Sequence, residues 1–490
     1  MRLSWHTYRY YPYERNLALR ELTALLRPAS ISETNERVEI SNYGNVDRAH
    51  DLTYFAGFAN GRGFTPTVQA RLEGGGLNRQ STRYSVHGLH EYKGKFNPQI
   101  AKAILNIFNV RPRQHVIDPF CGSGTTLVEC AHLHVVGYGT DINPLAVYIA
   151  NAKLRALTTP AEVLQRLIGE LDTRLSRKRP AKSLNSDFRI EYLTSWFTPT
   201  LLQSIENLAD VIREIAADNA QFFLAIASNL LREYSLQDPH DLRIRRRKSP
   251  LPDVPIVDSF LANCQHAVKR LSETQTVLGN DIPLGAASLR DVTTLTKAAV
   301  PHVYDAALTS PPYATALPYI DTQRLSLVWL NLLPPERILG LESELIGSRE
   351  LRGTQRKDAL AGMRENSAGL PESETEFCVR LQKAVGEKDG FRRRAVPVLL
   401  YRYFAAMQAS FSSIRKVMKR SAPFGLIVGH NHTVLNAARF DVNTPAHLAN
   451  IARTVGWRVE EVIDLQTYQR YGYHMNNAVA AESLILLRNS

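Results

Sequence analysis

The chain has 490 residues, 44% of them hydrophobic, which is the length and composition of a globular protein with about two to four domains. Its net charge of +12 favours a polyanionic partner, and nucleic acid is the most common one. The beginning of the chain lacks an apolar segment, no apolar run approaches about 18 residues, and the four cysteines have neither disulfide-framework nor zinc-site spacing. A secretory signal, a membrane-spanning helix and a bound metal are therefore not expected, and a cytoplasmic location is.

Residues 1–85 carry an aromatic and basic segment at 8–13, a helical pattern of leucines over 17–26, and then glycine-rich loops. We interpret this part as an N-terminal extension and a candidate DNA-contacting region. Aromatic clusters of this kind more often pack against the protein than stack on bases, so packing is the competing interpretation.

Residues 86–155 have the regular pattern of an α/β core. Asn97 and Pro98 predict the cap and the first position of a helix. The sequence then predicts a strand over 115–117, a glycine turn, a helix over 125–133, and a second strand that ends at Asp141. Strand, glycine turn, helix and strand in this order open a doubly wound, Rossmann-like sheet.

Residues 156–284 are predicted to be a mainly helical insertion, since apolar residues recur there at helical spacing. We regard it as a candidate target-recognition region. It contains a basic run that is predicted to bind DNA phosphates, although a solvated loop is an equally good interpretation. The basic residues of this run are Arg243, Arg245, Arg246, Arg247 and Lys248.

The core is expected to resume over 285–334, where an apolar strand at 303–308 leads into a proline-containing segment. Residues 335–395 are charged and poor in long apolar runs, which predicts a second, smaller insertion. Residues 396–490 are expected to complete the core with a strand at 425–428 and a closing pair of strands at 459–465 and 483–487.

The segment from Asp118 to Thr125 lies where the first predicted strand ends and the next helix begins. Its glycines let the backbone approach a ligand closely, and ligands of open α/β sheets lie beyond the carboxyl ends of the strands. The segment lacks the lysine of a phosphate-binding loop, which disfavours a nucleoside triphosphate. Asp141, about 20 residues later at the end of the next strand, has the position of an acid that accepts both hydrogen bonds of a ribose diol. A helix cap is the alternative role for Asp141.

The tetrapeptide Ser310-Pro311-Pro312-Tyr313 follows the strand at 303–308. Its two prolines fix the backbone and remove two donors, so the segment presents carbonyls, one hydroxyl and an aromatic ring. The Ser310 hydroxyl and the Pro311 carbonyl are suited to accept from the two N–H bonds of an amino group, and Tyr313 is suited to stack on a base. A proline turn packed by a tyrosine is the structural alternative.

Together these segments resemble the DNA amino-methyltransferases, the family that makes N4-methylcytosine or N6-methyladenine. Residues 118–125 are similar to the cofactor motif of this family, 137–144 to its acidic motif, and 309–313 to its catalytic motif. Residues 90–98 and 482–487 are similar to the segment near the methionine end of the cofactor and to the last core strand. The resemblance covers roughly half the chain, all of it in the predicted core, and implies S-adenosylmethionine as cofactor and double-stranded DNA as substrate.

The resemblance also implies roles for single residues. Asp141 is expected to hold the cofactor ribose and Ile142 to pack on its adenine, while Lys95 and Phe96 lie near its amino-acid end. The family often has an acid just before the catalytic strand. Here Ser288 stands at that position and Asp291 follows three residues later. The remaining residues expected to bind the cofactor are Asp118, Pro119, Phe120, Cys121, Gly122, Gly124, Thr125 and Asn143.

The expected activity is methylation of a flipped base, with cytosine N4 favoured because Ser310 stands where most adenine enzymes of the family have Asp or Asn. Such an enzyme is expected in a prokaryotic cytoplasm, associated with the nucleoid through DNA, and with a cognate restriction nuclease as a possible partner. Three alternatives remain: an adenine-N6 enzyme, an RNA base methyltransferase, and a non-enzymatic DNA-binding subunit that retains the cofactor fold.

Overall fold

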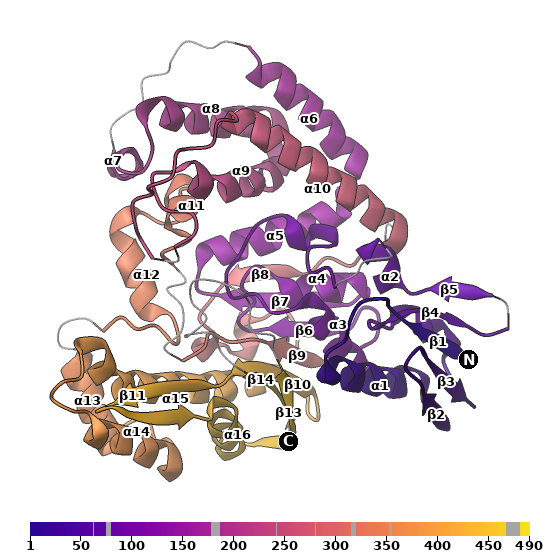
Figure 1. Ribbon diagram of the computed structural model, residues 1–490, viewed down its shortest axis with the longest axis vertical. Helices are drawn as coiled ribbons and strands as arrows, with labels where there is room; N and C mark the ends of the chain where they lie inside the picture. Colours follow the sequence, from indigo (N-terminus) through magenta and orange to yellow (C-terminus); the bar gives the residue numbers. More distant parts are fainter. Residues whose placement is uncertain are drawn as a thin grey trace.

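A central sheet of mostly parallel strands organises the molecule (Figure 1). The computed structural model describes the chain except residues 62, 75–79, 178–186, 242, 280, 315–319, 352–354 and 467–480. The strand order is β13-β14-β10-β9-β6-β7-β8. In that order the strands are Trp457–Gln466, Ala481–Asn489, Pro423–Gly429, Ala306–Thr309, His115–Asp118, Val136–Asp141 and Ala286–Leu289. The predicted doubly wound α/β fold is confirmed.

The sheet has its topological switch between β6 and β9. From β6 the chain proceeds to β7 and β8 on one side, and it later returns to β9 and β10 on the other side. These strands pair in parallel, whereas β14 is antiparallel to both β10 and β13, as the predicted closing pair requires. Crevices at such switch points are the usual ligand sites of open α/β sheets.

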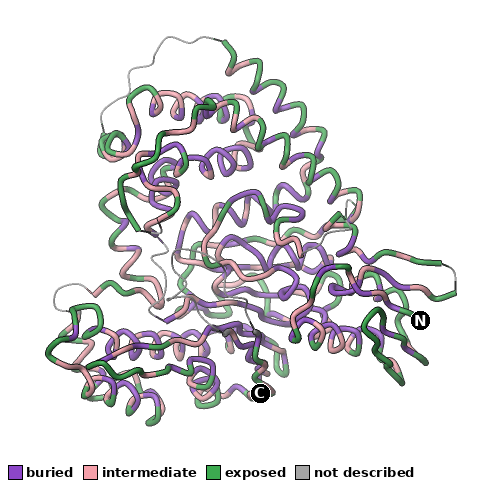
Figure 2. Tube along the Cα trace, in the orientation of Figure 1, coloured by how far each residue is buried: buried purple, intermediate pink, exposed green. Residues whose placement is uncertain are grey.

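Helices cover both faces of this sheet. On one face lie α3 (Pro98–Ile107), α4 (Thr125–His132) and α5 (Pro144–Thr158), and on the other lie α15 (Phe391–Val417) and α16 (Thr444–Thr454). The predicted cap of α3 is confirmed, since the Asn97 side chain accepts from Gln99 N at 2.8 Å. Figure 2 shows buried residues along the strands and on the sheet-facing sides of the helices.

The predicted insertion is mainly helical in the structure, where the described residues between α5 and β8 form helices, loops and one isolated antiparallel bridge between Gln237 and Arg246. Its apolar residues share one core with α4 and α5. The helices are α6 (Ala161–Leu175), α7 (Phe188–Thr194), α8 (Pro199–Ala216), α9 (Ala220–Tyr234) and α10 (Ile256–Leu278).

The second insertion is also helical and follows α11 (Arg324–Trp329). It contains α12 (Ile338–Glu344), α13 (Gln355–Glu365) and α14 (Glu372–Ala384). The predicted end at residue 395 falls inside α15, which already begins at Phe391. Its first turn is charged and exposed, so composition gave no sign of the helix start there.

The N-terminal part contains a sheet that the sequence did not indicate. Five antiparallel strands pair in the order β2-β3-β1-β4-β5, and α1 (Pro12–Leu26) packs against α3. The strands are Ser30–Glu33, Arg37–Ser41, Arg2–Trp5, Phe55–Ala59 and Phe64–Pro66, followed by α2 (Val68–Glu73). Tyr8 and Tyr13 of the aromatic segment are buried, which agrees with packing. A separate hairpin of β11 (Asn431–Leu435) and β12 (Ala438–Val442) was likewise not predicted.

Two further expectations concern the whole chain. All four cysteines are buried and free, so no disulfide is present. Within the described ranges, no helix combines the length and the apolar character that crossing a bilayer requires.

Candidate active site

The loops that follow β6 and β9 meet at the switch point of the sheet. The Thr309 hydroxyl, at the end of β9, donates to Asp118 Oδ1, at the end of β6, over 2.5 Å. The same carboxylate oxygen accepts from Phe120 N at 3.1 Å. Asp118 and Thr309 are buried, and burial raises the pKa of the Asp118 carboxyl to about 6. The predicted cofactor turn and the predicted catalytic segment therefore begin side by side.

Close packing in the glycine turn explains its residue types. Gly124 has φ +82°, and an added Cβ would lie 2.9 Å from Ala150 Cβ. An added Cβ at Gly139 of β7 would lie 2.5 Å from Cys121 Cβ. Larger residues would therefore displace the turn from the neighbouring strand and helix.

Asp141 lies at the end of β7 beside this turn. Its Oδ2 accepts from Gly122 N at 3.0 Å, and its Oδ1 accepts from Asn143 N at 2.9 Å. Burial raises the pKa of the Asp141 carboxyl to about 6 although both backbone bonds lower it. The side chain remains partly exposed, so the carboxylate shapes the turn and still has lone pairs for a ligand.

The predicted cofactor residues divide into two groups by burial. Phe120, Gly122, Asp141 and Ile142 are partly exposed and surround the ends of β6 and β7. The others in these two loops are buried and act on the shape of the loops: Asp118, Pro119, Cys121, Gly124, Thr125 and Asn143. Asn143, for example, caps α5 through Leu145 N at 3.0 Å.

Tyr92 and Gln323, which the sequence did not indicate as site residues, complete this region. Tyr92 lies against the turn, where an added Cβ on Gly122 would be 3.3 Å from its ring. The Asn143 amide donates to Gln323 Oε1 at 2.5 Å and to the Tyr92 hydroxyl at 3.4 Å. Tyr92 falls within the segment similar to the family, whereas Gln323 carries no recognisable pattern of its own.

Buried Lys153 of α5 also supports the turn. Its ammonium group donates to Ser123 O at 2.9 Å, and burial together with the charge of Lys95 lowers its pKa to about 7. Lys95 itself donates to His87 O at 3.2 Å, and both Lys95 and Phe96 are partly buried. The Lys95 charge is therefore close enough to Lys153 to affect its pKa.

The predicted catalytic segment is held from several directions. Tyr313 donates its hydroxyl proton to Glu482 Oε1 at 2.6 Å, which fixes the ring against the start of β14. The Asn431 amide donates to Ala314 O at 2.7 Å. Gly347 lies so close that an added Cβ would be 2.5 Å from Tyr313 O. Ser310, the first residue of the tetrapeptide, is partly exposed, whereas Pro311 is buried.

Asp291 has a local role in the structure. Its exposed carboxylate accepts from Thr293 N and from the Thr293 hydroxyl, each at 2.8 Å, and so caps a short 3-10 turn at Val292–Thr294. Ser288, at the position expected for an acid, donates to Gly139 O at 3.4 Å. Neither side chain contacts Asp141 or the glycine turn through a hydrogen bond that the structure describes.

The five residues of the basic run differ in exposure. Arg243, Arg245, Arg246 and Lys248 are exposed, although Arg245 pairs with Asp241 at 3.0 Å. Arg247 instead donates to backbone carbonyls, including Ser235 O at 3.0 Å and Ser249 O at 3.1 Å. Arg247 therefore stabilises its own loop.

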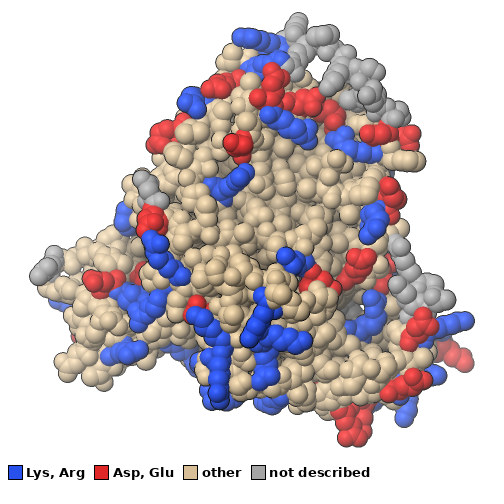
Figure 3. Space-filling model, turned by 180° about the vertical axis from the view of Figure 1, so that it is seen from behind, with Lys and Arg blue, Asp and Glu red and all other residues tan. Residues whose placement is uncertain are grey.

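Charged side chains are unevenly distributed on the face of the molecule seen from behind. There, Lys and Arg side chains gather in the lower middle, below a broad area with few charges (Figure 3).

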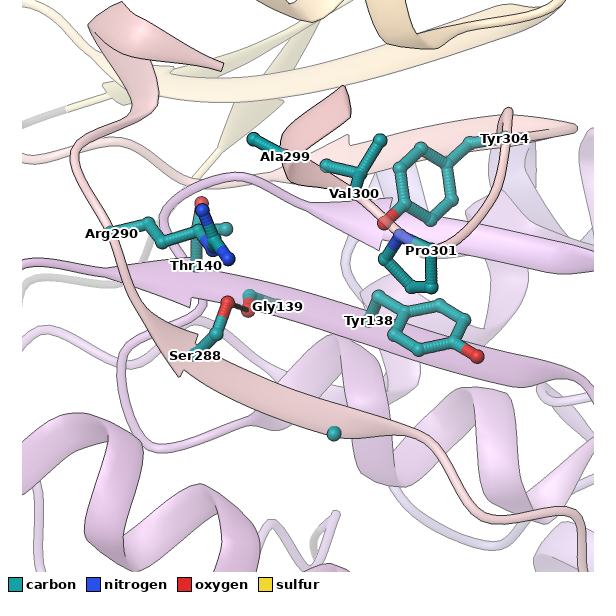
Figure 4. Close-up of a pocket in the computed structure, with 10 residues that line it drawn as sticks. Tyr138, Gly139, Thr140, Ser288, Arg290, Ala299, Val300, Pro301 and Tyr304 are labelled. Atoms are coloured by element: carbon teal, nitrogen blue, oxygen red, sulfur yellow. Dashed lines mark hydrogen bonds between the residues drawn. The ribbon is translucent and has the colours of Figure 1, made fainter. Parts of the chain in front are cut away.

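A small cavity lies over β7 and β8, next to the site (Figure 4). Its volume is about 160 Å³, and Tyr138, Ser288, Arg290 and Tyr304 are among its lining residues. Asp141 and the predicted catalytic tetrapeptide do not line it. A cavity of this size is below the roughly 300–1,000 Å³ typical of small-molecule sites, so the strand ends remain the better candidate site.

A buried cluster under the site was not predicted. Glu129 of α4 accepts from the Tyr84 hydroxyl at 2.7 Å, and its oxygens lie 2.6 Å from His87 Nε2 and 3.2 Å from His132 Nδ1. Glu129, His87 and His132 are the one group of possible metal ligands that the described residues contain. Both carboxylate oxygens of Glu129 already accept hydrogen bonds. We therefore interpret the cluster as structural: it holds the segment from Tyr84 to Tyr92 against α4.

Glu129→Ala is expected to destabilise the protein by about 3 kcal/mol or more, because it leaves buried partners at Tyr84, His87 and His132 without an acceptor. The midpoint of thermal unfolding should fall by several degrees. Glu170→Ala, which removes an exposed ion pair with Arg166 at 3.5 Å, is the control and should change little. A chelator that lowers the midpoint of the wild-type protein would contradict the metal-free interpretation.

Comparison with known proteins finds methyltransferases among the sequences similar to this chain. The family model described as RMKL-like, methyltransferase domain (UPF0020) matches residues 89–176. Type II methyltransferase M.MvaI of Kocuria varians is 26% identical over 366 residues, which is 70% of this chain and 76% of the relative. M.AvaI of Nostoc sp., also a type II methyltransferase, is 20% identical over 77% of this chain and 80% of its own. The chain is thus similar to type II methyltransferases over most of its length.

A shorter match has a higher sequence identity. Type II methyltransferase M.MjaII of Methanocaldococcus jannaschii is 45% identical over 80 residues, which is 16% of this chain and 15% of the relative. Among solved structures, the rRNA methyltransferase AviRa of Streptomyces viridochromogenes covers 82% of this chain and 89% of its own at 14% identity, with a TM-score of 0.30. A score this low adds nothing to the assignment of the fold, which rests on the strand order.

Proposed function

We propose that this protein transfers the methyl group of S-adenosylmethionine to the exocyclic amino group of a flipped base in double-stranded DNA, with cytosine N4 as the target. The observation that carries the proposal is the bond from Thr309 to Asp118, which brings the glycine turn and the Ser310–Tyr313 segment together at the switch point. The relatives that are type II methyltransferases support the same activity and a place in a restriction–modification system, with a cognate nuclease as partner.

The residues present fit the proposed cofactor. Glycines at 122 and 124 leave the turn without side chains, and Asp141 offers a partly exposed carboxylate next to it. Phe120 of the turn and Ile142, the residue after Asp141, are partly exposed apolar side chains. Asp141 would hold the ribose, Ile142 the adenine, and Lys95 the amino-acid end. When bound, the cofactor supplies an electrophilic methyl group on sulfur.

The chain's own residues would position the base and polarise its amino group. The Ser310 hydroxyl and the Pro311 carbonyl would each accept a hydrogen bond from one N–H of the amino group. These hydrogen bonds strengthen as the nitrogen becomes tetrahedral and positive, so they stabilise the transition state more than the ground state. Tyr313, fixed by Glu482, replaces the stacking lost on flipping, worth about 1–3 kcal/mol. Alignment of nitrogen, methyl carbon and sulfur supplies much of the rate.

Two kinds of observation favour this function over the alternatives. Ser310 in place of Asp or Asn favours cytosine N4 over adenine N6. The intact tetrapeptide with its supporting contacts from Glu482 and Asn431 favours an enzyme over a binding subunit. An RNA base methyltransferase remains the alternative in which the same site acts on another nucleic acid, and one RNA-modifying relative, a tRNA (guanine(10)-N2)-dimethyltransferase, matches 11% of the chain.

The test is incubation of the protein with S-adenosylmethionine carrying a labelled methyl group and with genomic DNA, followed by digestion and nucleoside analysis. Label in N4-methylcytosine is expected. Label confined to N6-methyladenine would overturn the choice of base, and label confined to RNA in a parallel incubation would overturn the choice of substrate.

A further inference from the structure

Helix α11, which follows the Ser310–Tyr313 segment along the chain, is held by the helical insertion at both of its ends. It packs against α7 and α9 (Figure 1). At its beginning, the Arg324 guanidinium donates to the Tyr192 hydroxyl at 2.8 Å. At its end, the Arg189 guanidinium donates to Trp329 O at 2.9 Å. The position of α11 is therefore set by residues of the insertion.

The ring of Trp196, in the link between α7 and α8, contacts two guanidinium groups from different parts of the chain. The group of Arg324 lies 3.9 Å from the ring centre, and the group of Arg246 lies 4.8 Å from it. Both distances are within the range of cation–π contacts. Arg324 is 5% exposed, whereas Arg246 is exposed. One indole ring thus joins α11 to a basic residue on the surface.

Hydrogen bonds fix the loop between α9 and α10 that carries Arg246. Gln237 and Arg246 form an antiparallel bridge, and Leu236 N donates to Trp196 O at 2.8 Å. The buried side chain of Gln237 also donates to Asp321 O, just before α11, at 3.3 Å. Arg246 is therefore held beside α11 before any ligand binds, so little side-chain entropy would be lost on binding.

The contacts of Arg324 continue to the candidate active site. Its neighbour Gln323 accepts from the Asn143 amide at 2.5 Å, and the same amide donates to the Tyr92 hydroxyl at 3.4 Å. Asn143 belongs to the loop after β7 that begins at Asp141. A displacement of Arg324 would therefore also displace a side chain that supports this loop.

The guanidinium of Arg246 is suited to bind a phosphate. Among the described residues it forms no ion pair with a carboxylate, whereas Arg245 pairs with Asp241 at 3.0 Å and Arg247 donates to carbonyls of its own loop. Because Arg324 carries the same charge on the same ring, an anion next to Arg246 would offset their repulsion. Guanidinium groups also donate two parallel hydrogen bonds to phosphate oxygens.

We propose that Arg246 binds a phosphate of the DNA backbone, and that Trp196 and Arg324 are positioning residues that couple this contact to methyl transfer. The inference rests on the proposed function. It singles out one residue of the basic run and gives the bound phosphate a second effect. By holding Arg246 against Trp196, the phosphate would stabilise the position of α11 in which Gln323 supports the loop after β7.

The phosphate contact is tested by the salt dependence of binding to a duplex of arbitrary sequence, measured by fluorescence anisotropy without cofactor. Arg246→Gln should reduce the slope of log K against log salt by about 0.9, because one phosphate contact is lost. Arg246→Lys should keep most of the slope. Arg111→Gln is the matched control and should leave the slope unchanged, since Arg111 is exposed and precedes the amino end of β6.

The coupling is tested by the single-turnover rate of methyl transfer at saturating cofactor and saturating DNA of a kind that the wild-type protein methylates. Arg246→Gln and Arg246→Lys should both lower this rate by about threefold or more, because neither side chain stacks on Trp196 as a guanidinium does. Trp196→Leu and Arg324→Lys should each lower the rate as well. Adding Arg246→Gln to either variant should cause little further loss, because the connection is already broken.

An unchanged slope in Arg246→Gln, or an equal loss in Arg111→Gln, would overturn the phosphate contact. The coupling would be overturned by an unchanged rate in Arg246→Gln. The same holds if Arg246→Gln lowers the rate by one common factor in the wild-type, Trp196→Leu and Arg324→Lys proteins. If wild-type protein methylates DNA and these results fail, only this inference is wrong. If wild-type protein methylates RNA alone, the proposed function is wrong.

Discussion

Ser310→Ala is expected to lower the turnover of methyl transfer by about 10²-fold or more while cofactor affinity stays within about twofold. The hydroxyl would accept a hydrogen bond that strengthens only as the amino nitrogen gains positive charge, and loss of one such preorganised group typically costs about 10²–10³ in rate. Ser310 is partly exposed and directly follows Thr309, whose hydroxyl donates to Asp118. The substitution therefore removes few packing contacts. Single-turnover transfer to DNA and equilibrium binding of the cofactor measure the two quantities separately.

Ser204→Ala provides the control for this experiment. Ser204 lies on α8, where its hydroxyl donates to Thr200 O at 3.0 Å, far along the chain from either site loop. Its loss should leave both turnover and cofactor affinity unchanged. Parallel losses of turnover and of cofactor affinity in Ser310→Ala would mean that the segment binds the cofactor and does not act on the base.

Asp141→Asn is expected to weaken cofactor binding about ten- to hundredfold. The variant keeps one oxygen for a backbone N–H but loses the charge that strengthens hydrogen bonds from a ribose diol, and such bonds contribute about 1.5–3 kcal/mol. Because Asp141 Oδ2 also accepts from Gly122 N, part of the loss would come from the glycine turn itself. Isothermal titration with S-adenosylmethionine measures the effect, and circular dichroism checks that the fold persists.

The direction in which cofactor affinity changes with pH follows from the Asp141 carboxyl. The pKa of Asp141 is raised to about 6, so a proton occupies the carboxylate below that pH and would compete with the ribose hydroxyls of the proposed cofactor. The contribution of Asp141 to cofactor affinity should be constant from about pH 7 upward, and its loss should lower the affinity about tenfold on going to pH 5. Asp118, with a pKa also about 6, is buried and bonded to Thr309, so Asp141→Asn should remove most of this dependence. A pH profile that Asp141→Asn leaves intact would assign the dependence to Asp118.

Asp291→Asn distinguishes the two acids that the sequence offered for the cofactor. The structure uses Asp291 as a cap for Thr293, and its side chain is exposed. We therefore expect its replacement to change cofactor affinity less than twofold. A loss as large as that of Asp141→Asn would place Asp291 at the cofactor in solution.

The sequence by itself determined the parts of this protein that depend on neighbours along the chain. Strand, glycine turn and helix at 115–133 are recognisable because backbone freedom, capping and apolar spacing are local properties. The same holds for the segment at Ser310 and for the helical character of 156–284. These local patterns were sufficient for the fold class and for the position of both site loops.

Only the tertiary structure decided what those loops touch. The bond from Thr309 to Asp118 joins residues 191 positions apart, and Glu482 reaches Tyr313 over 169 positions, distances at which sequence spacing carries no information. Burial likewise separated Asp141, which remains partly open to a ligand, from Asp118, which supports the loop. The five-stranded N-terminal sheet was missed for the same reason, because its strands are short and gain stability from pairing and packing more than from local preference.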